Sequence, residues 1–249
     1  MKGSLVLFGL LAVPFAASTV PAQARVDGER PEYTILRAGT PIVVDGRLDE
    51  LAWVAAPDVG PFSFPRYESG KMERTIAKLL WDDTHLYAAF IVEDAHIWAV
   101  HTERNSQVWL DDAVEIFGSP DPSRPDAYFN IEMNAIGIFL DQFRPGGAGA
   151  PRPVWNAEGI QVKTTIVGTL NDDSDEDSYW ILEAAIPFRN FAAVAINTPP
   201  RPGDVWNLNL NRLGGNTNAQ ASQWSPSLPN FHQPDQFGRV VFSDRTVPF

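Results

Sequence analysis

Two short segments of the sequence carry polar side chains at alternate positions, and these residues are suited to ligand contact. They are Glu115 in the first segment and Tyr128, Asn130 and Glu132 in the second. Residues two apart on a strand point to the same face, so each polar row is expected to share one face. The apolar residues between them are expected in a core: Val114, Ile116, Phe129, Ile131 and Met133. Carboxylates and amides bond paired hydroxyls, and aromatic rings stack on flat apolar surfaces, so this face suits a neutral polyhydroxylated ligand.

Four further residues are candidates for the same site. Trp109 follows a polar run and precedes two aspartates, which predicts a position at a loop mouth. Phe231 and His232 lie in a polar loop, where the phenylalanine would stack on a ligand and the histidine would bond a hydroxyl. Asn209 is the centre of a row of three alternating asparagines, residues that are poor strand formers, which favours a ligand-facing surface.

Most of the eight tryptophans are instead expected to serve structure. Trp53, Trp81, Trp180 and Trp206 lie in or beside apolar strand patterns and are predicted in the core, and Trp224 is assigned a structural role. The four histidines show no spacing typical of a metal site. No phosphate-binding loop or nucleophile elbow is present in the sequence.

Short apolar runs recur along the chain with proline- and glycine-rich connections between them. The pattern predicts an all-β fold, an antiparallel β-sandwich of jelly-roll type in a single domain. Short helical pieces are expected at residues 48–55 and 188–191. The expected strands are residues 42–44, 77–80, 86–92, 113–117, 128–134, 137–141, 160–167, 179–186, 205–211 and 239–242.

The beginning of the chain has the pattern of an export signal. Lys2 precedes an apolar stretch from Leu5 to Ala17, and Ala22-Gln23-Ala24 is a typical cleavage site. The expected organisation is a signal peptide at 1–24, a loose leader at 25–33, the sandwich at 34–244 and a tail at 245–249. The protein is therefore expected in the periplasm or outside the cell.

Composition narrows the range of partners. The formal net charge of −12 disfavours nucleic acid and anionic lipid, and no segment after the signal is long and apolar enough to span a membrane. The chain has no cysteine, so its stability depends on a sizeable core or on bound cations. An acidic loop at residues 171–177 is either a solvated charge run or a site for structural Ca²⁺, although its spacing matches no EF-hand.

Five segments, in order along nearly the whole chain, resemble carbohydrate-binding module family 9 and the family 9-like sugar-binding domains. They are residues 41–53 (PIVVDGRLDELAW), 80–87 with 92–94 (LWDDTHLY and VED), 109–117 (WLDDAVEIF), 180–187 (WILEAAIP), and 223–226 through 234–238 (QWSP and PDQFG). The resemblance implies a jelly-roll sandwich that binds sugars, often with structural calcium.

The resemblance also implies roles for particular residues. In family modules that clamp a terminal sugar, two tryptophans sandwich the ring while a glutamate, an arginine and amides bond its hydroxyls. Trp109 matches the first tryptophan and Glu115 the glutamate. Phe231 falls at the second aromatic position, and the strand that would supply arginine and asparagine offers Asn130 and Glu132. Both aromatic positions of the family modules therefore hold an aromatic residue in this chain, whereas the polar residues differ from those of the modules.

The function favoured by these observations is non-catalytic binding of a mono-, oligo- or polysaccharide in an aromatic and polar cleft, alone or beside a partner glycosidase in polysaccharide catabolism. One alternative is a glycoside hydrolase using Glu115 and Glu132 as a carboxylate pair, since neighbouring strands allow the required spacing. A second alternative is a haem-binding redox domain of similar shape, for which Met72 and Met133 are the available methionines after cleavage.

Overall fold

The computed structural model describes residues 30–146 and 155–248. The expected signal peptide and most of the expected leader lie outside these residues. The strands are β1 (Glu32–Arg37), β2 (Thr75–Trp81), β3 (His85–Glu93), β4 (Asp112–Ser119), β5 (Tyr128–Asn134), β6 (Phe139–Arg144), β7 (Gln161–Val167), β8 (Tyr179–Pro187), β9 (Val205–Gly214), β10 (Ala221–Gln223) and β11 (Gly238–Thr246). The short helices are α1 (Leu51–Ala55), η1 (Val108–Leu110), η2 (Phe188–Phe191) and η3 (Pro234–Gln236).

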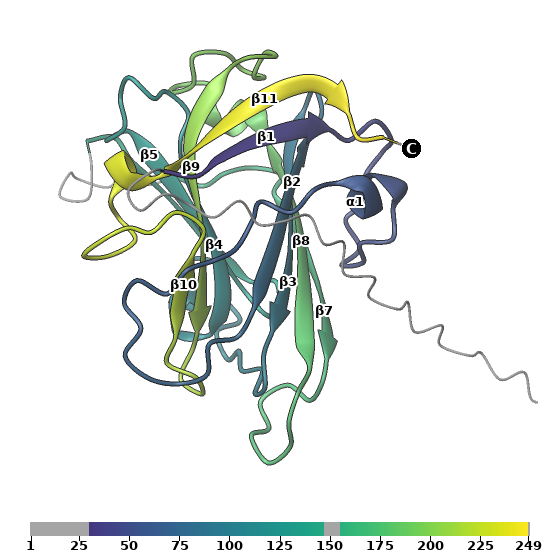
Figure 1. Ribbon diagram of the computed structural model, residues 1–249, viewed down its shortest axis with the longest axis vertical. Helices are drawn as coiled ribbons and strands as arrows, with labels where there is room; N and C mark the ends of the chain where they lie inside the picture. Colours follow the sequence, from purple (N-terminus) through teal and green to yellow (C-terminus); the bar gives the residue numbers. More distant parts are fainter. Residues whose placement is uncertain (1–29, 147–154, 249) are drawn as a thin grey trace, which may run out of the picture.

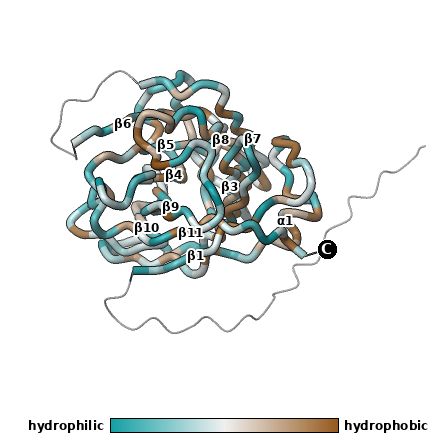
Figure 2. The backbone as a smooth tube through the Cα atoms, turned by 90° about the horizontal axis from the view of Figure 1, so that it is seen from above, coloured by the Kyte–Doolittle hydropathy of each residue, from teal (hydrophilic) through white to brown (hydrophobic). Residues whose placement is uncertain are grey.

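The strands form two facing layers joined along one margin, which confirms the predicted β-sandwich. Their order is β6-β5-β4-β9-β11-β1-β2-β3-β8-β7, with β10 paired to β9. Figure 1 shows β11 and β1 crossing between the β4–β5–β9 layer and the β2–β3–β8–β7 layer, and Figure 2 shows the two layers on opposite sides. The pairs within each layer are antiparallel, whereas β1 runs parallel to both β11 and β2.

The core lies between the two layers and contains four of the tryptophans expected to be structural. Trp81, Trp180 and Trp224 are fully buried there, and Trp206 is 2% exposed. Trp53 is also fully buried, but in the small cluster around α1. Because alternate residues of a strand face opposite sides, the apolar rows of β4 and β5 also enter this core. The predicted burial of Val114, Ile116, Phe129, Ile131 and Met133 is confirmed.

Several expected boundaries differ from the observed ones. Residues 42–44 form no strand, because the run lies between Pro41 and the turn at Gly46, and Val43 is 62% exposed. Ile42 and Val44 instead pack against the small cluster around α1. β1 begins at Glu32, inside the expected leader, and β11 ends at Thr246, inside the expected tail. β1 and β10 are strands that the sequence pattern does not predict.

A buried charge network connects the two layers at one end of the sandwich. Arg212 of β9 is fully buried and donates through Nη2 to Asp94 Oδ2 at 2.9 Å and to Glu73 Oε2 at 3.2 Å. Asp112 Oδ1 lies 3.9 Å from the same nitrogen and has no hydrogen-bond partner within the described residues. Trp180 Nε1 also donates to Asp94 Oδ2, at 3.2 Å. Three carboxylates therefore share one guanidinium away from water.

The pKa of Asp112 gives this network a dependence on pH. Burial and the Asp94 charge raise this pKa to about 8, while Arg212 acts in the opposite direction. In the unfolded chain an aspartate has a pKa of about 4, so the native state holds the proton more tightly between these values. The stability contributed by protonation is therefore complete below about pH 4 and is lost as the pH rises through about 8.

Asp112→Asn is expected to flatten the fall in stability between these pH values, because the amide does not ionise. Urea unfolding at pH 5, 7 and 9 measures this slope, with exposed Asp126→Asn as the control. An unchanged slope in Asp112→Asn would show that Asp112 ionises in the native state as readily as in the unfolded chain.

Candidate functional site

The polar residues expected to share a face do so, on the side of β4 and β5 turned away from the core. Glu115 pairs directly with Glu132 of β5 and with Asn211 of β9. Asn130 pairs with Phe117, two residues after Glu115 in β4. We call Glu115, Asn130, Glu132 and Asn211 the polar floor. The floor continues to Tyr128, whose partner in β6 is Arg144.

The polar floor is buried and internally hydrogen-bonded. Glu115 is 2% exposed and Glu132 is 6% exposed, while Asn130 and Asn211 are fully buried. Asn130 Nδ2 donates to Glu132 Oε1 at 2.7 Å, and Asn211 Nδ2 donates to Glu115 Oε2 at 3.1 Å. Asn211 Oδ1 has no partner within the described residues. Buried carboxylates are costly in a fold, so a pair in direct register indicates a purpose beyond packing.

Burial and the neighbouring charge shift the pKa of Glu115. Desolvation raises this pKa well above its usual value, and the charge of Glu132 raises it further. The hydrogen bond from Asn211 and the positive charge of Arg66 act in the opposite direction. The pKa of Glu115 therefore depends on any group that forms a new hydrogen bond to its carboxyl group.

Aromatic rings line one end of the polar floor. Phe117, Tyr128, Phe231 and Phe237 form a separate cluster, in which the Phe231 ring meets the Phe117 ring edge-on at 6.4 Å. His232 stacks near Phe117 at 4.9 Å, and its Nδ1 is 2.9 Å from the Tyr128 hydroxyl. Phe231 is only 9% exposed, so it is more enclosed than the open loop aromatic that the sequence suggests.

Trp109 lies at the other end and is the open ring of the site. It belongs to η1, which packs against β4 and β5, and it is 37% exposed. Asp111, the residue that ends η1, accepts from Asn134 Nδ2 at 2.8 Å, and Asn134 lies in the same row of β5 as Asn130 and Glu132, so η1 ends at this face. The sequence predicts a loop mouth for Trp109, whereas the structure places it in a short 3₁₀ helix with its ring partly exposed.

Asn209 serves the scaffold, in contrast to its predicted place in a ligand-facing row. Its Nδ2 donates to the Ser225 carbonyl at 2.8 Å, and its Oδ1 accepts from the Ser225 amide at 2.9 Å. Both ends of the amide are thus used to hold the segment that follows β10. Asn211, two residues along the same row, faces Glu115 instead.

Two arginines that the sequence analysis did not predict lie at the site. Arg144 of β6 is 3% exposed; its Nε is 3.4 Å from Asn130 Oδ1, and its Nη2 is 3.4 Å from His232 Nε2. Arg66 comes from the loop between α1 and β2, and its guanidinium lies 4.2 Å from the centre of the Phe231 ring. Arg144 continues the alternate-residue pattern of β6, a signal that the sequence does contain, whereas Arg66 has no such signal.

Two side chains of the acidic loop, Asp177 and Asn171, bond to backbone amides. Asp177 accepts from the amides of Ile97 at 2.7 Å and Thr169 at 2.5 Å, and Asn171 Oδ1 accepts from the Ala99 amide at 2.8 Å. These oxygens are turned onto the backbone to hold the loop. Across residues 30–146 and 155–248 no group of three or more histidine, aspartate or glutamate side chains could hold a metal ion.

The haem alternative is not supported by the positions of its methionines. Met133 is fully buried in the core between the layers, and Met72 is 54% exposed in a loop. The two side chains do not face one site. Neither of these two methionines, the ones within the described residues, is placed to share an axial-ligand site with the other.

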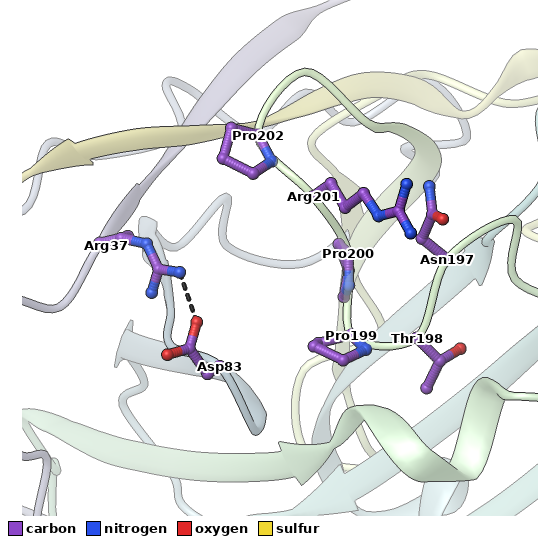
Figure 3. Close-up of a pocket in the computed structure, with 8 residues that line it drawn as sticks. All are labelled: Arg37, Asp83, Asn197, Thr198, Pro199, Pro200, Arg201 and Pro202. Atoms are coloured by element: carbon purple, nitrogen blue, oxygen red, sulfur yellow. Dashed lines mark hydrogen bonds and ion pairs between the residues drawn. The ribbon is translucent and has the colours of Figure 1, made fainter.

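A shallow pocket of about 330 Å³ lies elsewhere, between the end of β1 and the loop before β9. Figure 3 shows Arg37 and Asp83 joined by an ion pair on one side and the loop from Asn197 to Pro202 on the other. No aromatic ring is among its lining residues, so this pocket lacks the stacking surface present at the polar floor.

The fold and the site together define a β-sandwich with a buried polar set flanked by aromatic rings. A family model described as carbohydrate-binding family 9 matches residues 65–242, and the chain belongs to this family. The chain is 25% identical over 206 residues to endo-1,4-beta-xylanase A of Thermotoga maritima and 26% identical over 207 residues to that of Thermotoga neapolitana. Each match covers 81% of this chain, but the chain spans only 17% of each relative's length.

Solved structures agree on the fold. A protein from Bacteroides uniformis, described as a candidate carbohydrate-binding protein, superposes with a TM-score of 0.70 at 19% identity, covering 86% of this chain and 100% of that one. Two structures of a family 9 module from Caldicellulosiruptor kristjanssonii, one with cellotriose and one with glucose, give TM-scores of 0.59 at 19% and 18% identity. Each covers 88% of this chain and 98% of that one.

Proposed function

We propose that this chain is an exported, non-catalytic carbohydrate-binding protein that holds a saccharide between Trp109 and the polar floor. The observation that carries the proposal is the buried Glu115–Glu132 pair, in direct register and flanked by aromatic rings. Family membership supports saccharide binding, and the sugars bound by the Caldicellulosiruptor modules, glucose and cellotriose, suggest the first probes.

The geometry supports binding through stacking and hydroxyl recognition. The exposed Trp109 ring provides a flat surface for the apolar face of a sugar. Hydroxyl groups would then donate to the carboxyl groups of the floor and to Asn211 Oδ1, a buried acceptor that has no partner within the described residues. A neutral ligand suits this arrangement because a ligand carboxylate would face two glutamates.

A glycan array of the chain from Arg25 onward, followed by calorimetric titration with cellotriose, tests the proposal. Parallel samples with Ca²⁺ and with a chelator test separately the proposal of a structural calcium ion. Binding to no saccharide on the array would refute the proposed function. A shift in melting temperature that depends on Ca²⁺ would support a structural calcium ion.

Glu115→Gln is expected to weaken saccharide binding by about ten- to a hundredfold, because a charge-assisted hydrogen bond contributes about 1.5 to 3 kcal/mol. The amide keeps the shape of the side chain, so the melting temperature should change little. Glu158→Gln, on an exposed loop, is the matched control and should bind as the wild type does. Equal affinity in Glu115→Gln and the wild type would remove Glu115 from the site.

A hydrolase remains the second candidate because the two glutamates are cross-strand partners. Side chains directly opposite in an antiparallel pair have Cβ atoms about 5 Å apart, near the carboxyl spacing of retaining glycosidases. Incubation with the array's tightest oligosaccharide and an assay for new reducing ends separates the candidates. We expect no release; release that is lost in Glu115→Gln and Glu132→Gln would establish the hydrolase.

Export and a place in the periplasm or outside the cell belong to the same proposal, and the support is the signal-like pattern at residues 1–24. Within the described residues no helix is long and apolar enough to cross a membrane. A partner glycosidase is proposed because family 9 segments match part of two xylanases. Fractionation of cells that express the full chain measures the localisation directly.

A further inference from the structure

We propose that Arg66 is a ligand-contact residue, which with Glu115 forms a charged donor–acceptor pair that recognises two adjacent hydroxyl groups of a neutral saccharide. This inference rests on the proposed function and adds to it the determinant of ligand specificity. No motif predicts it, since Arg66 lies in a loop far along the chain from both β4 and Phe231.

The loop that carries Arg66 is fixed to the same row of residues as the polar floor. Ser63 and Gln223 exchange two backbone hydrogen bonds, at 2.8 and 2.9 Å. Gln223 pairs with Asn211, and Asn211 pairs with Glu115. The Ser63 backbone therefore extends this row by one position beyond β10, and the chain reaches Arg66 three residues later.

Arg66 is held at the rim rather than buried in the floor. Its guanidinium lies 4.2 Å from the centre of the Phe231 ring, and its Nη1 donates to the Pro229 carbonyl at 3.4 Å. The Arg66 side chain is partly exposed, whereas Glu115 is 2% exposed. A ligand that approaches the floor thus meets Arg66 and Trp109 before it meets the carboxylates.

The charges of Arg66 and Glu115 act on each other across the site. Arg66 lowers the pKa of Glu115, and Glu115 raises the pKa of Arg66 against the effect of burial. A guanidinium only donates hydrogen bonds, and a carboxyl group accepts them through its carbonyl oxygen in either protonation state. One hydroxyl can therefore accept from Arg66 while its neighbour donates to Glu115, which is the pattern offered by a vicinal diol.

Stacking on Phe231 keeps the guanidinium in place for this role. A cation above an aromatic face is stabilised by the ring, and the planar fork loses little freedom when it bonds a ligand. Lysine has a single flexible ammonium and cannot reproduce both features. Arg66→Lys is consequently expected to recover only part of the affinity that Arg66→Ala loses.

The test measures saccharide binding by Arg66→Ala, Arg66→Lys and the matched control Arg37→Ala. Arg37 also stacks on an aromatic ring, at 4.3 Å from the Trp81 centroid, but it lines the pocket of Figure 3. Titrations use cellotriose, or the array's tightest saccharide where cellotriose does not bind. We expect at least tenfold weaker binding for Arg66→Ala, an intermediate value for Arg66→Lys, and wild-type affinity for Arg37→Ala.

Two further measurements separate ligand contact from a structural effect. In a double-mutant cycle with Glu115→Gln, the two losses should be less than additive, because both substitutions break the recognition of one diol. Carboxyl NMR titration without saccharide should show a higher Glu115 pKa in Arg66→Ala than in the wild type, while Arg37→Ala leaves it unchanged.

The outcomes distinguish this inference from the proposed function. If the wild type binds a saccharide and Arg66→Ala binds it equally well or more tightly, Arg66 is not a contact and at most covers Phe231. An unchanged Glu115 pKa in Arg66→Ala would also refute the proposal that Arg66 and Glu115 act as a pair. If the wild type binds no saccharide on the array, the proposed function fails, and the ligand role of Arg66 fails with it even where the NMR titration shows the charge interaction.

Discussion

Arg212→Met is expected to lower the free energy of unfolding by about 3 to 5 kcal/mol, the cost typical of leaving buried partners of an ion pair without their counter-charge. Methionine fills much of the volume, so the loss reports the charge rather than a cavity. Asp94 and Glu73 would lose their common donor, and Asp112 would lose the one charge that lowers its pKa. Asp112, whose pKa is about 8, keeps its proton at pH 5 with or without Arg212, so the loss should be smaller at pH 5 than at pH 8.

Urea denaturation at both pH values measures the effect, and Arg239→Met provides the matched control. Arg239 pairs with Glu32 on the surface, where the two side chains are 45% and 57% exposed. Exposed pairs contribute about 0 to 1 kcal/mol, so this substitution should have little effect. Equal losses in the two variants would show that the buried network contributes no more than a surface pair.

A second pair of substitutions should separate the tryptophans of the core from the tryptophan of the site. Trp81→Ala is expected to destabilise the protein by about 3 to 5 kcal/mol through cavity formation. Trp81 is fully buried, donates to the Ser243 carbonyl at 2.9 Å and meets the Phe242 ring edge-on at 5.3 Å. Trp109→Ala should barely change stability but should weaken saccharide binding by about 1 to 3 kcal/mol.

Thermal melts and calorimetric titrations of both variants give the comparison. Phe231→Ala is expected to show both effects, because the ring stacks with its neighbours and is 9% exposed. A loss of stability in Trp109→Ala as large as that in Trp81→Ala, with saccharide affinity intact in the folded fraction, would make Trp109 a core residue. The site would then lack its exposed stacking surface.

Alternation of apolar and polar residues predicted most of the strands, because half-buried strands have to show it. β5 occupies the predicted residues 128–134, and β4, β8 and β9 begin within one residue of the predicted positions. β10 has three residues, too few for a period to show. The parallel pairing of β1 could not be predicted, since it depends on partners more than forty residues away along the chain.

The same alternation placed Glu115, Tyr128, Asn130 and Glu132 on one face, and the register confirms this arrangement. It also contained an unused signal for the charge network. Arg212 follows Leu208 and Leu210 at alternate positions of β9, and both leucines face the core. The alternation therefore already predicted a buried arginine. Arg66 could not be found in this way, because its contact with Phe231 depends on how a loop returns over a distant segment.

The pairing of β1 with β11 has a consequence for when the fold can be completed. Glu32 pairs with Arg239, and only Leu36 and Arg37 at the end of β1 pair with β2. Contacts between segments so distant in sequence form slowly, because the entropy of closing the intervening chain is lost before they stabilise anything. A ribosome-bound chain without β11 has both layers but not the strand that joins them. Completion of the sandwich must therefore follow synthesis of the C-terminal segment.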